Sequence, residues 1–161
     1  MKLTPHTFTK EPLSQSSSDA RYDFLIENHK KAIECMELVQ PYQHDQGHFG
    51  YVETKNPCGT AACALGWVAV GNWIDGLQYT TEYVLKNRAP HNYDSLSPII
   101  NGKHGDTWRT AGCNFFGWTT YERVFSNAYL NKEGVISHLK ARLKSLQMHR
   151  KDYKPYFRQP Q

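Results

Sequence analysis

A run of small and apolar residues between Ala61 and Ile74 places the strongest limit on how this chain can fold. The segment reads Ala-Ala-Cys-Ala-Leu-Gly-Trp-Val-Ala-Val-Gly-Asn-Trp-Ile, so a helix built from it has almost no polar face. Such a helix has to be covered by other elements on nearly every side. We therefore predict a central, buried helix over residues 61–74, with Thr60 as its N-cap.

Two amphipathic segments can supply that cover. Apolar residues recur at helical spacing from Asp19 to Gln40, where Pro41 ends the pattern, and again from Lys132 to Gln147. A shorter helix is predicted from Trp108 to Phe116, capped by Asp106 or Thr107. These segments are expected to pack around the central helix.

The remaining segments have weaker patterns. Thr119-Thr120-Tyr121-Glu122 fits a capping box and predicts the start of another short helix. Residues 78–86 are predicted as a short helix, and residues 49–54 are the one plausible short strand. Residues 87–107 contain Pro, Gly and an Asn-Gly pair and are predicted as a long loop.

Together these elements predict a mainly α fold: a single compact helical domain around a buried central helix, with long loops and at most a small hairpin. The 161 residues are enough for one hydrophobic core. We expect a flexible N-terminal arm over residues 1–18, the helical domain over 19–147 and a basic, aromatic tail over 148–161. There is no apolar run of membrane-spanning length and no signal segment, so a cytoplasmic protein with no membrane contact is expected.

Cys58 is the candidate nucleophile of the chain. It precedes Gly59 and Thr60, and at a helix N-terminus the backbone N–H groups and the helix dipole favour a thiolate. His48 or His104 would then serve as the general base of a cysteine-dependent hydrolase or transferase. The alternative is a structural cysteine, which we favour, so an enzymatic role is the minor hypothesis.

A zinc site is a further alternative. His44, His48, Cys58 and Cys63 offer imidazole and thiolate ligands within a short stretch. However, the two cysteines are separated by more residues than the usual zinc knuckle has, and Cys63 falls inside the helix predicted to be buried. We therefore predict no metal and no cofactor.

Charge is concentrated towards the C-terminus. Residues 132–158 contain eight Lys or Arg against two acidic residues. Lys140, Arg142 and Lys144 are the core of this basic segment, which suits either an acidic protein surface or, alternatively, nucleic acid. The aromatic residues predicted to add contact area to a binding surface are Tyr42, Phe49, Tyr51 and Tyr93.

The segment Asn56-Pro57-Cys58-Gly59-Thr60-Ala61-Ala62-Cys63-Ala64-Leu65-Gly66-Trp67 resembles a family of small, mostly uncharacterised bacteriophage and prophage proteins with a Cys-Gly-Thr-x-x-Cys-x-x-Gly core. The resemblance implies a small α-rich fold and a phage-associated origin, but no established reaction or cofactor. Small phage proteins of this kind commonly bind and redirect a host protein. The predicted function is therefore an accessory protein that binds a host or phage protein, as an inhibitor of a host factor in the host cytoplasm.

Overall fold

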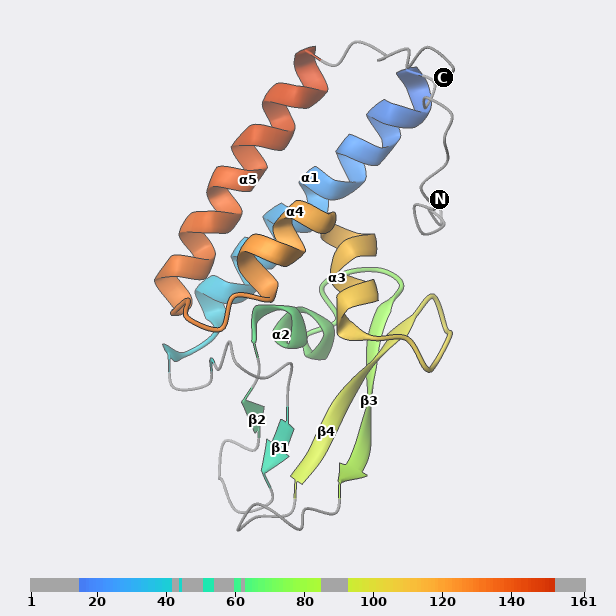
Figure 1. Cartoon of the computed structure of the whole chain (residues 1–161), viewed down its shortest axis with the longest axis vertical. Coiled ribbons are helices and arrows are strands. Elements are labelled where there is room, and N and C mark those ends of the chain that lie inside the picture. Colours follow the sequence, from blue (N-terminus) through green and yellow to red (C-terminus); the bar gives the residue numbers. More distant parts are fainter. Residues whose placement is uncertain are drawn as a thin grey trace.

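The computed structural model describes residues 15–41, 44, 51–53, 60–61, 63–84 and 93–152. Helices occupy one end of the molecule and strands the other (Figure 1). In chain order the elements are α1 (Gln15–Leu38), β1 (Tyr51–Glu53), β2 (Thr60–Ala61), α2 (Ala64–Val70), β3 (Leu77–Val84), β4 (Tyr93–Ile100), α3 (Trp108–Phe116), α4 (Trp118–Thr120), the π-helix η2 (Tyr121–Phe125) and α5 (Lys132–Asp152).

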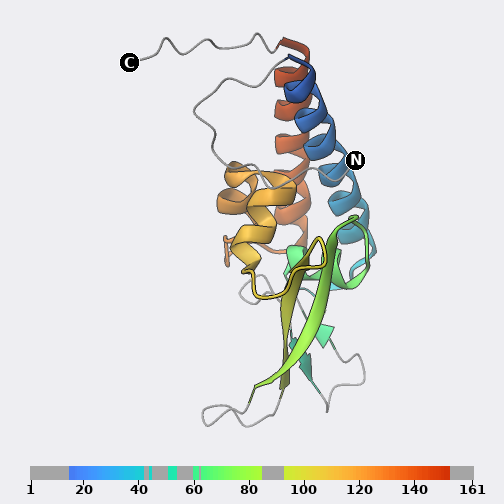
Figure 2. The same cartoon turned by 90° about the vertical axis from the view of Figure 1, so that its right-hand side faces the viewer.

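The long helices α1 and α5 lie side by side and run antiparallel, and α3 and α4 pack on one side of them (Figures 1 and 2). Both long helices were predicted, but each is longer than expected: α1 begins at Gln15, and α5 continues to Asp152. At the start of α5 the side-chain oxygen of Asn131 accepts a hydrogen bond from the Gly134 amide at 2.8 Å. The inward faces are those that the helical spacing indicated. The buried residues are Leu25, Ile26, Asn28, His29, Ala32, Ile33, Cys35 and Met36 in α1, and Val135, Leu139 and Leu146 in α5.

The central helix is buried as predicted, but its start is not at Thr60. Helix α2 begins at Ala64, and its N-cap is Cys63, which is extended and makes no side-chain capping bond. Thr60 instead belongs to β2 and pairs with Val52 of β1. Thr60 and Ala61, which the sequence pattern assigned to the start of the helix, therefore pair as a strand instead.

The sheet has the strand order β2-β1-β4-β3, and its pairs are antiparallel. The mainly α fold is confirmed, and the hairpin it allowed is β3–β4, extended on one side by the short strands β1 and β2. Two local predictions are wrong: residues 77–84 form a strand rather than a helix, and the predicted loop contains β4. The β3 sequence Leu-Gln-Tyr-Thr-Thr-Glu-Tyr-Val is rich in aromatic and β-branched residues, which favour strands.

Strand β4 was not predicted from the sequence because it contains Pro98, and proline is rare inside sheets. Pro98 pairs with Tyr79 of β3, whereas β1 pairs with β4 only from Tyr93 to Ser95. In the described part of the chain, β3 is the strand beside Pro98, and proline is tolerated where a strand has a neighbour on one side. Beyond the strand, Asn101 and Gly102 have positive φ angles of 50° and 80° and form a tight turn that returns Lys103 to Ile100.

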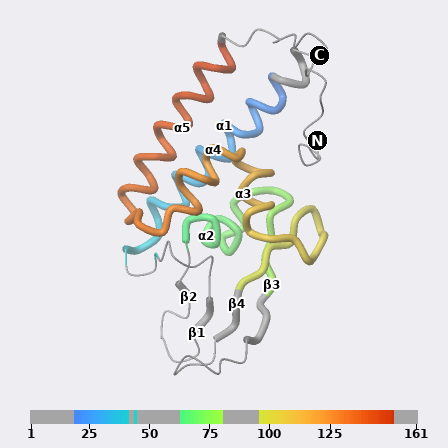
Figure 3. Tube along the Cα trace, viewed as in Figure 1, coloured from blue at the N-terminus to red at the C-terminus, as the bar shows by residue number. Residues whose placement is uncertain are grey.

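Helix α3 has the predicted bounds, and its N-cap Thr107 accepts a hydrogen bond from the Thr110 amide at 3.1 Å. The chain then turns sharply into α4 (Figure 3) at Gly117, whose φ of 87° is in the region that favours glycine. The short helix after it was predicted, but the capping box was not correct: Gly117 is its N-cap, and Thr120 lies within it with its side chain buried.

Candidate functional site

The central helix begins further along the chain than the predicted cysteine site assumed, and a catalytic role for Cys58 stays a prediction. Cys58 and His48 lie outside the described residues, but β2 lies between position 58 and the start of α2. The helix N-terminus that was expected to activate Cys58 is therefore at Cys63 and Ala64, and that part of the argument was wrong. His104 is described and is exposed in the connection between β4 and α3.

The described cysteines are unsuited to nucleophilic chemistry. Cys35 and Cys63 are buried in the core, and Cys113 is half-buried. Burial raises the pKa of Cys35 to about 12 and also raises the pKa of Cys113, because a thiolate is poorly stabilised away from water. The thiols of Cys35 and Cys113 therefore stay protonated at neutral pH.

Of the four residues considered as zinc ligands, His44 and Cys63 are described, and His48 and Cys58 are not. Cys63 is fully buried at the start of α2, as expected for a core residue. Within the described ranges, no three His, Cys, Asp or Glu side chains gather in a way that would hold a metal ion.

The basic residues predicted on α5 are partly engaged by the fold itself. Lys140 forms an ion pair with Glu37 of α1 at 3.7 Å, and Arg142 donates from Nε to Thr120 Oγ1 at 3.4 Å. Lys144 is exposed. Much of the positive charge that the sequence assigned to a binding surface is therefore balanced or anchored by neighbouring elements.

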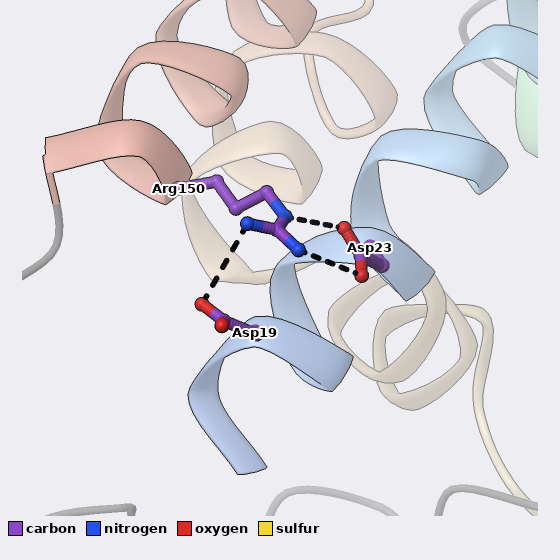
Figure 4. A network of polar contacts seen from close by, with 3 residues as sticks. All are labelled: Asp19, Asp23 and Arg150. Atoms are coloured by element: carbon purple, nitrogen blue, oxygen red, sulfur yellow. Dashed lines mark hydrogen bonds and ion pairs between the residues drawn. The ribbon is translucent and has the colours of Figure 1, made fainter. Parts of the chain in front are cut away.

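Further along α5, Arg150 binds the first turns of α1 (Figure 4). Its Nε and Nη2 atoms donate to the two carboxylate oxygens of Asp23 at 2.6 and 3.3 Å, and its Nη1 atom lies 3.8 Å from Asp19. This contact lowers the pKa of Asp23 and raises that of Arg150. The α1–α5 pair therefore carries ion pairs near both of its ends.

Two of the four aromatic residues predicted to bind a partner belong to the described structure. Tyr42 and Phe49 lie outside it. Tyr51 and Tyr93 lie on the neighbouring strands β1 and β4, where their backbones pair with Ser95 and Glu53. The strand positions support a shared location for these two tyrosines in the sheet, far along the chain from the basic helix.

A different aromatic residue is exposed where α3 and α4 meet. Trp118, the first residue of α4, is 45% exposed, and the Arg109 guanidinium of α3 lies 4.7 Å from the centre of its ring. The ring of Tyr121 also lies near Trp118, with 6.1 Å between the two ring centres. The sequence offered no signal for this pair, because it depends on how α3 and α4 are joined at Gly117.

A series of hydrogen bonds around the buried His29 connects α4 to α1 and α5. His29 is fully buried, and its Nδ1 is 2.6 Å from the Leu25 carbonyl while its Nε2 is 2.8 Å from Thr120 Oγ1. A carbonyl only accepts, so Nδ1 carries the proton, Nε2 accepts from Thr120, and Thr120 accepts from Arg142. Burial and the Arg142 charge lower the pKa of His29 to about 4, although the bond to Leu25 opposes this. These hydrogen bonds join α1, α4 and α5 through the buried side chains of His29 and Thr120.

The charge of a second arginine, Arg123, acts on Arg142. Burial lowers its pKa, and so does the positive charge of Arg123, which follows Thr120 on η2. Arg123 is exposed and Arg142 is half-buried.

Comparison with family models, curated proteins and solved structures gives no match to this chain. The phage resemblance of residues 56–67 therefore stays a prediction. Within the described residues, no helix combines the length and apolar character needed to cross a membrane.

Proposed function

We propose that the protein is a phage-associated accessory protein of the host cytoplasm, which acts by binding a host or phage protein. The observation that carries this proposal is the exposed Arg109–Trp118 pair on the α3–α4 layer. Inhibition of a host factor is the expected result of such binding.

Tryptophan and arginine are the residue types that most often dominate the energy of protein interfaces. A half-exposed Trp118 ring has apolar surface that a partner can cover, and Arg109 holds one face of the ring in a defined place. A side chain that is already ordered loses less freedom on binding than a mobile one. The pair therefore has the chemistry and the order of an interface anchor.

A binding role also agrees better than catalysis with the described thiols, which are buried or have a raised pKa. Binding to nucleic acid is less favoured by the same structure. Lys140 and Arg150 face carboxylates of α1, so α5 does not present an uninterrupted row of free cations.

Affinity capture from bacterial lysate, after nuclease treatment, tests the proposal. The captured protein is then purified, and its affinity is measured for the wild type, for Trp118→Ala and for Tyr129→Ser. Tyr129 is the matched control, because it is 98% exposed on the connection between η2 and α5. We expect Trp118→Ala to weaken binding about tenfold or more and Tyr129→Ser to leave it unchanged.

Equal affinity for the wild type and Trp118→Ala would contradict this placement of the interface. Capture that disappears on nuclease treatment would contradict a protein partner. Circular dichroism of both variants establishes that they keep the helical fold.

A further inference from the structure

In the described part of the chain, the outer edge of β3 has no neighbouring strand. β3 stands at the end of the strand order β2-β1-β4-β3, and Figure 2 looks towards this edge, with β3 in front of β4. Its eight residues, Leu-Gln-Tyr-Thr-Thr-Glu-Tyr-Val, pair with β4 in an unbroken register. The strand therefore has no proline, no lysine and no β-bulge, which are features that commonly protect an edge from pairing with another chain.

Hydrogen bonds at the start of β3 show which of its backbone groups point outwards. In an antiparallel pair, positions that exchange hydrogen bonds alternate with positions whose N–H and C=O groups point away from the partner strand. Leu77 lies opposite Ile100, but the Leu77 amide donates to the Ile74 carbonyl at 3.2 Å. The Ile100 amide likewise turns away and donates to the Lys103 carbonyl at 3.0 Å. Leu77 is therefore an outward position.

The next positions along the hairpin agree with this alternation. Two residues on, Tyr79 lies opposite Pro98, which has no N–H to donate to it. Two residues further, Thr81 lies opposite Leu96, whose carbonyl accepts a hydrogen bond from Trp108 Nε1 at 2.9 Å. The backbone N–H and C=O groups of Tyr79 and Thr81 therefore point to the outer edge of β3.

The unpaired part of this edge is symmetric about Thr81. At Leu77 the edge is closed by the chain itself, because the Ile74 carbonyl takes the outward amide. The outward positions that remain are Tyr79, Thr81 and, by the same alternation, Tyr83. In the described part of the chain, no strand pairs with these positions on their outer side. Their residue types read the same in both directions from Thr81.

We propose that a second copy of this chain pairs with β3 along this edge, antiparallel and about a two-fold axis at Thr81. In this register Thr81 lies opposite its own counterpart, and Tyr79 lies opposite Tyr83. Thr80 lies opposite Glu82, so the one charge of the strand does not meet its own copy. Pairs of aromatic residues and pairs of threonines stabilise neighbouring strands, whereas like charges directly opposite destabilise them.

The symmetry of the residues favours a second copy over an unrelated strand. Backbone hydrogen bonds alone allow any extended segment to add to an edge strand. The symmetric order of residues matters only when the same strand lies opposite, as it does in a two-fold dimer. This contact goes beyond the proposed function, because it uses the sheet rather than Trp118.

Sedimentation over a range of protein concentrations tests the pairing. The wild type should form a dimer, and Thr81→Pro should weaken it about tenfold or more, because one outward N–H is lost from each copy. Thr81→Lys places two lysines opposite each other at the axis and should weaken the dimer several-fold. Thr80→Lys is the matched control. Its lysine lies opposite Glu82, so the dimer should be at least as tight as that of the wild type.

Amide hydrogen exchange of the wild type gives a second reading that needs no variant. In the dimer, the outward amides of Tyr79, Thr81 and Tyr83 should be protected, and this protection should fall on dilution. The amides of Thr80 and Glu82 occupy the alternate positions, which bond to β4, and should stay protected at every concentration.

The proposal is overturned by a monomer at every concentration, or by a dimer whose outward amides exchange freely. Equal dimerisation of Thr81→Lys and Thr80→Lys, with circular dichroism showing that both keep the fold, would place the contact elsewhere and also overturn it. Outward amides that are protected in the monomer, or only after a captured partner is added, would assign the edge to the chain itself or to that partner instead. Trp118→Ala should leave the dimer intact, so failure of the dimer and failure of the Trp118 interface are distinguishable.

Discussion

The buried His29 predicts a specific loss of stability in mild acid. Its ring is neutral in the folded protein, and its pKa is lowered from 6.5 to about 4 by burial and by the Arg142 charge. Above pH 6.5 the ring is neutral in the folded and unfolded states. Between pH 6.5 and 4 the unfolded chain takes up a proton that the folded chain does not, so the free energy of unfolding falls as the pH falls.

The size of this effect follows from the gap between the two pKa values. At about 1.4 kcal/mol for each pH unit, the gap from 6.5 to about 4 amounts to about 3 kcal/mol. This is a large share of the 5–15 kcal/mol that stabilises a typical domain. Below the pKa of the folded protein, the ring is protonated in both the folded and the unfolded states. This contribution to the pH dependence therefore levels off.

Urea denaturation of the wild type and His29→Gln, at intervals from pH 7 to pH 4, measures the effect. Glutamine keeps a donor and an acceptor, so the variant should be less stable at pH 7 but should lack this part of the pH dependence. The difference between the two proteins should shrink by about 3 kcal/mol across the range. Because the other titrating groups are common to both, they cancel in that difference.

A constant difference between the two proteins from pH 7 to pH 4 would refute the reasoning. An NMR titration of the His29 ring in the wild type gives a second reading that does not depend on folding of the variant. Protonation of that ring in the folded protein near pH 6.5, rather than near pH 4, would refute it as well.

Two other substitutions test the packing of α3 and of the α1–α5 pair. Gly112→Ala places a Cβ too close to Cδ2 of Tyr121, so we expect the free energy of unfolding in urea to fall by about 1–3 kcal/mol, and unchanged stability would contradict this contact. Asp23→Asn removes the paired carboxylate of Arg150 at an exposed site. A small destabilisation is expected that disappears as salt is raised, and the same loss at low and high salt would argue against an ionic origin.

The helices that could be predicted are those with local signals. Thr107 before Trp108 marks the start of α3, and the apolar spacing of α1 and α5 identifies their buried faces, including His29. These signals lie within the element that they specify. They can therefore be recognised in the sequence without knowledge of the rest of the fold.

The features that sequence reasoning missed depend on distant neighbours. Pro98 is a strand residue because Tyr79 of β3 pairs with it, and Thr60 is a strand residue because Val52 of β1 lies opposite. Thr120 resembles part of a capping box, but packing turns it towards His29 on α1.

The pairing of α1 with α5 also affects how the chain folds during its synthesis. The Arg150–Asp23 contact spans 127 residues of sequence, and Lys132 reaches the Glu37 carbonyl across 95 residues. On the ribosome, the apolar face of α1 therefore emerges long before the helix that covers it. The nascent chain has to keep this face from sticking elsewhere until α5 is made, and loss of α5 would leave a surface that chaperones and proteases recognise.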